Sequence, residues 1–127
     1  MAEESLRFLT KVTTINETYV PIGNQGWYVK GGRRAFYDQQ PIEAGAMVEA
    51  TTLAYRLTRS ESYEQGIRQA LGWFFGLNTK TVKLYDESTG ACSDGINETG
   101  LNENQGAEST LAFLLAAETF IENLKDE

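Results

Sequence analysis

Two short repeats carry the residues of this sequence that are best placed to do chemistry. Gln40-x-x-Glu43 and Gln105-x-x-Glu108 each stand at the start of a predicted helix, and they lie 65 residues apart (105 − 40). Paired carboxylates can act as general acid and general base on a glycosidic bond. A glutamate in the first turn of a helix can instead complement the helix dipole, so both interpretations stay open.

Further polar residues flank the two repeats. Asp38 can cap the helix that follows it or act as an acid. Asp94 precedes a glycine in a turn, where an aspartate commonly bonds its own backbone but can also face a ligand. Asn104 is the expected cap of the last helix. The candidate catalytic residues are therefore Asp38, Glu43, Asp94 and Glu108, and Gln40, Asn104 and Gln105 are candidate ligand-binding residues.

Aromatic and basic side chains in polar, glycine-rich connections form a second group of candidates. Aromatic faces can stack on sugar rings, although core packing would account for any one of them. Adjacent arginines can pair with loop acids or grip a phosphate or a carboxylate. The candidate substrate-binding residues of this group are Trp27, Tyr28, Tyr37 and Tyr85, together with Arg33 and Arg34.

Composition narrows the function classes. A net charge of −7 argues against nucleic acid and against an anionic membrane surface as partner. The sequence has no histidine, which excludes Ser-His-Asp and Cys-His catalysis and every His-ligated metal site. “GGRRAF” and “GNQG” lack the spacing of a phosphate-binding loop, so nucleotide binding has no support. We expect neither a metal nor a cofactor. The single cysteine, Cys92, allows no internal disulfide and is expected to be a packing residue.

No targeting or membrane segment is visible in the sequence. No apolar run approaches the roughly 18 residues of a membrane span. The N-terminus “MAEESLRFLTK” carries acids where a secretory signal carries bases. We therefore expect a cytoplasmic protein that forms one domain over residues 1–127, a length suited to a single core.

The pattern of apolar residues predicts an all-α fold with long connections. Helices are expected over residues 3–14, 41–58, 61–77 and 105–123. The second and fourth are apolar nearly all round and should be buried, whereas the third has a single apolar face. Residues 15–39 are expected to be irregular, and residues 78–103 to hold one short β-hairpin. The aromatic run Trp73, Phe74 and Phe75 is expected to be core.

The predicted order of helices gives a structural reason for the repeated Gln-x-x-Glu motif. Alternate helices in an array of helical hairpins run parallel, so helices 41–58 and 105–123 should begin at the same end of the molecule. Gln40, Glu43, Gln105 and Glu108 should meet there, beneath the two long connections. Asp38 and Asp94 should face the same end, with Trp27 or Tyr28 nearby.

Several segments together resemble a known family. They are “IGNQGWYVKGGRRAFYDQQPIEAGAMVEA”, “WFFGLN”, “LYDESTGACSDG” and “NENQGAESTLAFLLA”. They resemble the C-terminal part of six-hairpin (α/α)6 toroid proteins, in particular the glycosidase-like helical domain associated with bacterial group 1 glycosyltransferases. The resemblance covers about residues 20–117. It implies a carbohydrate ligand at the mouth of the toroid and a glycosyltransferase as partner or fused domain.

The chain departs from that family in size, since it has about two helical hairpins where a full toroid has six. It is therefore expected to be a partial toroid, either a fragment or a remnant of a longer protein. Two functions follow: a carbohydrate-active enzyme that uses carboxylates, or a non-catalytic carbohydrate-binding or interaction module. Apolar helix faces left open by the missing hairpins predict a homo-oligomer, with a two-fold dimer as the default.

Overall fold

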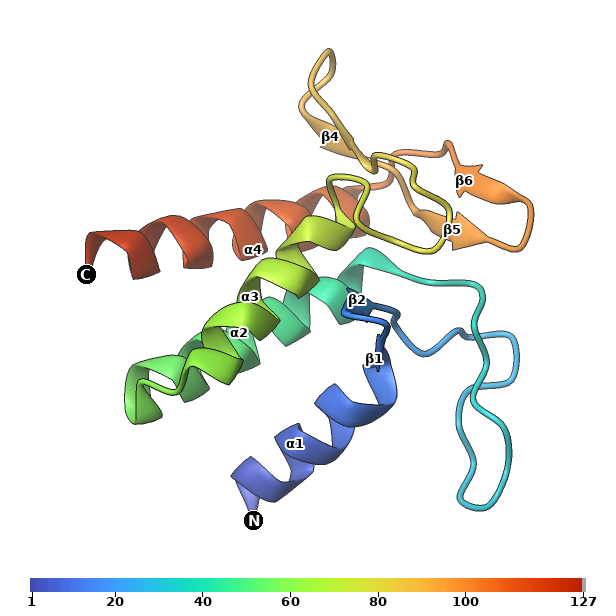
Figure 1. Cartoon of the computed structure of the whole chain (residues 1–127). Coiled ribbons are helices and arrows are strands. Elements are labelled where there is room, and N and C mark those ends of the chain that lie inside the picture. The colour runs from blue at the N-terminus through green and yellow to red at the C-terminus, as the bar shows by residue number, and fades with distance from the viewer. Residues whose placement is uncertain (127) are drawn as a thin grey trace.

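The computed structural model describes residues 1–126 and shows a mostly helical protein (Figure 1). Its helices are α1 (Ala2–Thr13), α2 (Pro41–Thr58), α3 (Glu61–Trp73) and α4 (Ala107–Lys125). The predicted helical class is therefore confirmed, and α2 has the predicted bounds. No helix of the described chain combines the length and the apolar character needed to cross a membrane.

Small antiparallel strand pairs occupy the connections. They are β1 (Thr14–Ile15) with β2 (Thr18–Tyr19), β3 (Tyr85–Asp86) with β4 (Ala91–Cys92), and β5 (Gly95–Asn97) with β6 (Gly100–Asn102). The single hairpin predicted within residues 78–103 is present as β3–β4. The prediction missed the other two, because strands of two or three residues are too short to show a periodic pattern.

Two of the helix boundaries that differ from the prediction have clear local reasons. Helix α3 ends at Trp73, because the chain turns through Gly76, whose φ of +105° lies in the region that favours glycine. Helix α4 begins at Ala107, two residues after the predicted start, and Gly106 is its N-cap. Asn104 was expected to be that cap, and this prediction was wrong. The carboxylate of Asp94 accepts the N–H of Gly106 and fixes the start of the helix.

Helix α2 lies at the centre of the molecule and packs against both α3 and α4 (Figure 1). α2 and α4 run in the same direction, as the alternation of helices predicts. Near their starts, a Cβ on Gly45 would come within 3.0 Å of the carbonyl oxygen of Ala112. Near their ends, Arg56 pairs with Asp126 at 3.1 Å. The N-termini of both helices therefore meet at one end of the protein.

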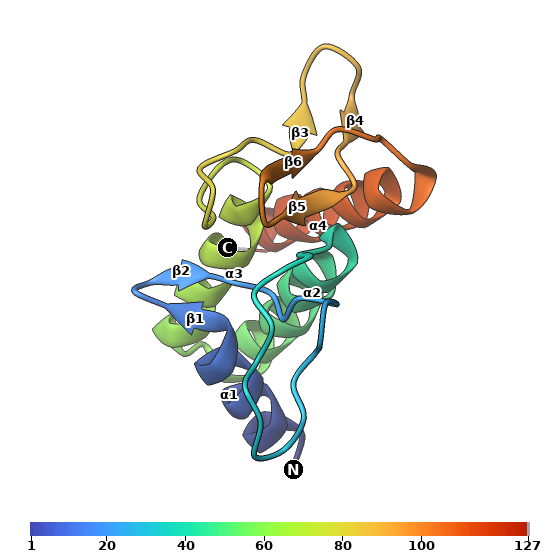
Figure 2. The ribbon, with the colours of Figure 1, turned by 90° about the vertical axis from the view of Figure 1, so that its right-hand side faces the viewer.

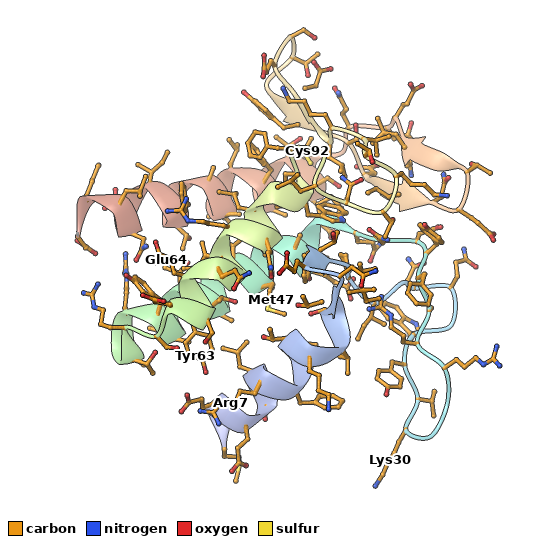
Figure 3. The ribbon with its side chains drawn as sticks, viewed as in Figure 1. Arg7, Lys30, Met47, Tyr63, Glu64 and Cys92 are labelled. Atoms are coloured by element: carbon orange, nitrogen blue, oxygen red, sulfur yellow. The ribbon has the colours of Figure 1, made fainter. Side chains whose placement is uncertain are left out.

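The core lies where α2 and α3 pack together beneath the hairpins. Val48, Ile67, Trp73 and Phe74 are completely or almost completely buried there. Phe75 is 46% exposed, so its assignment to the core was wrong. Cys92 is buried, as a packing residue should be, and Figure 3 shows it between the hairpins and the helices.

The two helices that were expected to be buried all round bury only one face each. On α2 the buried face includes Ala44 and Val48, whereas Leu53 is 59% exposed. On α4 Phe113 is buried and Leu115 is 51% exposed. The apolar residues of the opposite faces remain open, because no further helix of the described chain covers them.

Candidate functional site

A pocket of about 420 Å³ lies at the end where α2 and α4 begin. It contains three of the four predicted catalytic residues, Asp38, Asp94 and Glu108, and also Gln40. The other lining residues come from the neighbouring connections and helix starts: Asn24, Gln39, Pro41, Gly95, Ile96, Asn97, Asn102, Gly106, Ala107 and Ser109. The lining therefore combines carboxylates, amides and a hydroxyl, and includes neither a basic side chain nor an aromatic ring.

The hairpin β5–β6 is fixed above the start of α2 by a backbone bridge. Gln39 N–H donates to the carbonyl of Ile96 at 2.8 Å, and Ile96 N–H returns a bond to Gln39 at 3.0 Å. Gly95 makes this approach possible, because a Cβ there would collide with the carbonyl oxygen of Gln39. Figure 2 shows β5 lying beside the N-terminal end of α2. The bridge holds one wall of the pocket against the helix start.

Asp94 connects the hairpins to the start of α4. Its Oδ1 accepts the backbone N–H of Gly106 and the hydroxyl of Ser109, both at 2.8 Å. The first bond satisfies a backbone N–H that the helix N-terminus leaves without an intrahelical partner, and the second ties the side chain of Ser109 to the same oxygen. Although Asp94 lines the pocket, one of its oxygens is thus occupied in positioning α4, which is a structural task.

Asp38 is held in the pocket by the two legs of the preceding loop. Asn24 N–H donates to the Asp38 carbonyl at 3.0 Å, and Gln25 N–H donates to Tyr37 in the same way at 3.0 Å. The Asp38 carboxylate accepts only a long bond, 3.4 Å, from the Gln25 side chain. Glu108 is exposed and makes no side-chain hydrogen bond to another described residue. Asp38 and Glu108 are therefore the carboxylates best able to bond a ligand.

Glu43 is not among the residues that line the pocket. Its Oε2 is buried and has no hydrogen-bond partner within the described chain. Burial raises the pKa of the Glu43 carboxyl from about 4.5 to about 7, and the positive charge of Arg34 offsets part of this increase. Tyr19 is also buried, and burial together with the charge of Glu43 raises the pKa of its hydroxyl. The two glutamates of the repeat thus occupy different surroundings.

The raised pKa of Glu43 predicts a pH-dependent stability. Because the folded-state pKa exceeds the unfolded value, folding is penalised as pH rises from about 4.5 to about 7. Replacing Glu43 with glutamine should remove this penalty, which we place at about 1–2 kcal/mol because the carboxyl is partly exposed. Urea denaturation at a series of pH values should show that the free energy of unfolding of the variant, relative to wild type, increases as the pH rises from about 4.5 to about 7.

The matched control for this prediction is Glu118→Gln, which changes an exposed glutamate of α4. The rise in stability relative to wild type should be specific to Glu43→Gln, so an equal rise in the Glu118 variant would contradict the prediction. A constant difference between Glu43→Gln and wild type from pH 4.5 to 8 would contradict the prediction.

Arg34 was predicted to bind substrate, but the structure gives it a role within the fold. Its guanidinium donates to the carbonyl oxygens of Val12 and Val20 at 2.7 and 2.8 Å and also to Pro21. It lies 4.7 Å from the centre of the Phe36 ring. Arg34 therefore joins the end of α1 to the loop before α2. Arg33, its exposed neighbour, does not line the pocket.

The predicted aromatic platform is not assembled at the pocket. Trp27 is 54% exposed, and Tyr28 stacks on Phe8 of α1 with ring centres 6.5 Å apart. Both belong to a loop that extends along α1, away from β5 and β6, with Lys30 at its outer end (Figures 2 and 3). The expectation that Trp27 or Tyr28 lies beside the acids was therefore wrong.

The remaining candidates also make contacts within the protein. Tyr37 donates to the Thr79 hydroxyl at 3.2 Å, and Tyr85 stacks on Phe113 with ring centres 4.5 Å apart. Gln105 bonds the Asp86 carboxylate at 2.9 Å, which ties the start of α4 to hairpin β3–β4. Together with Ser88, this bond lowers the pKa of Asp86 to about 2. Gln105 was expected to meet Glu108 at the pocket but lies outside its lining.

Several pocket residues were not predicted from the sequence. Asn24, Asn97, Asn102 and Ser109 line it, and Gln39 supplies its backbone bridge. A usable signal was present in the three asparagines between residues 97 and 104, because amides bond hydroxyl ligands as well as turn backbones. Within the described residues, no cluster of three or more acidic or cysteine side chains is arranged to hold a metal ion.

Comparison with known proteins does not assign the chain to a family. No protein-family model matches the chain, and no curated protein matches its sequence significantly. Any functional assignment therefore rests on the residues and geometry of the pocket.

Proposed function

We propose that the pocket at the N-terminal ends of α2 and α4 binds a carbohydrate. The observation that carries this proposal is the lining, which sets Asp38 and Glu108 among the side-chain amides of Gln40, Asn97 and Asn102. Carboxylates accept hydrogen bonds from sugar hydroxyls, and amides both donate and accept them. Because the lining has no basic side chain, a neutral sugar suits it better than a phosphorylated or acidic one.

The arrangement of helices supports the same proposal. Parallel helices α2 and α4 alternate with the antiparallel α3, which is the order that a partial α/α toroid requires. In the family that the sequence resembles, sugars bind where inner-helix N-termini and loops meet. The pocket lies at the corresponding end of α2 and α4, and it is formed by their first residues and by the connections that precede them.

Catalysis would fall to Asp38 and Glu108, the two lining carboxylates that are least engaged by other residues. One would protonate the leaving oxygen and the other would act as base or nucleophile. The second candidate function is a non-catalytic module that holds a sugar for a glycosyltransferase. Asp94 already bonds Gly106 and Ser109 at the start of α4, so fewer carboxylates are available for catalysis. This observation favours the non-catalytic module.

Isothermal titration with neutral mono- and oligosaccharides tests the proposal. We expect binding that Asp38→Asn and Glu108→Gln each weaken by about 10-fold or more, as the loss of a charged hydrogen-bond acceptor would give. Glu98→Gln is the control, since Glu98 is exposed in the turn between β5 and β6 and does not line the pocket.

The outcomes of this experiment separate the possible functions. Failure of every sugar to bind to a folded sample, or an equal loss in the Glu98 variant, would refute the pocket as a carbohydrate site. Release of shorter products from a bound oligosaccharide would identify an enzyme. Binding without products would identify the module.

A further inference from the structure

A ridge of mostly apolar side chains runs along the side of α2 that faces away from α3. Leu53 stands at its middle, and Ile42 and Leu57 stand near its two ends, with exposures of 59%, 48% and 78%. Grooves accompany the ridge on both sides. One of about 520 Å³ separates it from Leu111 and Leu115 of α4, and one of about 340 Å³ separates it from Leu6 of α1.

Charged residues on this ridge are arranged so that they can complement a second copy. Glu49, Leu53 and Arg56 follow one another at helical spacing and therefore share one stripe of α2. Glu49 lines the groove beside α4, and Arg56 reaches toward α4 to pair with Asp126, so both charges lie on the same side of Leu53. Consider a two-fold axis that passes next to Leu53 and runs perpendicular to the axis of α2. This symmetry would place Glu49 of each copy opposite Arg56 of the other copy.

The dimensions of the face also suit a second copy. A helix of 18 residues is about 27 Å long, and two neighbouring helices are about 20 Å wide. Such a face covers about 540 Å² on each copy and about 1,100 Å² in total, which just clears the roughly 1,000 Å² minimum for a biological interface and lies below the roughly 1,200–2,000 Å² of stable ones. An isologous dimer needs only one self-complementary patch of this kind.

We propose that this protein forms a two-fold dimer through the outer ridge of α2, with the two α2 helices antiparallel and Leu53 beside the axis. The antiparallel helix dipoles then attract one another, and two Glu49–Arg56 pairs flank a central apolar contact. The inference does not depend on what the pocket binds.

Sedimentation equilibrium and cysteine cross-linking test the dimer on the full chain. We expect a dimer with a dissociation constant in the micromolar range, weakened about 30-fold or more by Leu53→Asp. Under mild oxidation, Leu53→Cys should form a disulfide-linked dimer, because only a residue near the axis meets its own copy at disulfide distance. Cys92 is buried and does not interfere. Leu77→Cys is the matched control, since Leu77 is 66% exposed and lies outside the ridge.

Charge reversal tests the antiparallel alignment. Glu49→Arg and Arg56→Glu should each weaken the dimer roughly 10-fold, and the double variant should recover most of the loss because the pairs form again with opposite sign. Three results would overturn the proposal: a monomer at millimolar concentration, equal cross-linking of the Leu53 and Leu77 variants, or no recovery in the double reversal. A monomer would indicate that another segment or protein covers the ridge.

Discussion

Replacing Gln39 with leucine is expected to cost about 3–5 kcal/mol of folding free energy. Gln39 is completely buried, and its side chain completes three hydrogen bonds. The Oε1 atom accepts the indole N–H of Trp73 at 2.8 Å, and Nε2 donates to the Phe36 carbonyl and to the Thr79 hydroxyl, both at 3.0 Å. Leucine leaves the indole N–H of the buried Trp73 unsatisfied, which costs about 1–3 kcal/mol, and it removes two further hydrogen bonds worth about 0.5–1.5 kcal/mol each. Urea denaturation followed by circular dichroism measures the loss.

Gln40→Leu is the natural control for this prediction. Gln40 is the next residue in the chain and the same amino acid, but it is only partly buried and lines the pocket. Its replacement should change stability by no more than about 0.5 kcal/mol. If both variants lost the same stability, Gln39 would not be the polar junction that the structure shows. Weaker sugar binding in a stable Gln40 variant would support the proposed function.

The Gln39–Gln40 pair shows what the sequence could and could not predict about the site. The Gln-x-x-Glu repeat located the end of the molecule correctly, because helix starts can be recognised from a proline and from the apolar pattern that follows it. Which of the two glutamines faces inward depends on the direction in which the chain enters α2. That direction is set by a backbone bridge to Ile96, more than fifty residues away in sequence (96 − 39 = 57).

The same limit applies to the glutamates and the aromatics. Glu43 and Glu108 hold equivalent places in the repeat, yet one carboxyl is partly buried near Arg34 and the other is exposed at the pocket. Spacing along a helix gives a residue its face, but the packing of the neighbouring loops decides what covers that face. Trp27 and Tyr28 were misplaced because composition shows that a loop is aromatic without showing where the loop lies.

The helical framework was more accessible to prediction. Helix α2 was predicted with its observed bounds, since Pro41 marks its start and the apolar pattern continues to Leu57. The open ridge of α2 was harder, because a helix that is apolar all round has no pattern that separates a core face from an interface. Only the positions of α3 and α4 show which side of α2 remains free.

Replacing Arg34 with methionine is the second change with a large expected effect, about 3–4 kcal/mol of lost stability. The guanidinium donates to the carbonyls of Val12, Val20 and Ala35 at 2.7 to 3.1 Å. Methionine keeps much of the apolar stem but leaves carbonyls at the end of α1 and in the loop before α2 without their donor. Arg33→Met is the matched control, and it should cost no more than about 0.5 kcal/mol because Arg33 is exposed.

The pH dependence of this loss separates the two roles of Arg34. The carbonyl bonds do not titrate, so their loss should be the same at pH 5 and pH 8. The attraction to Glu43 exists only when that carboxyl is ionised, which in the folded protein requires a pH above its raised pKa of about 7. Arg34→Met should therefore lose more stability at pH 8 than at pH 5, and the excess should disappear in the Glu43→Gln background. An excess that persists there would mean that another acid, and not Glu43, is the partner of Arg34.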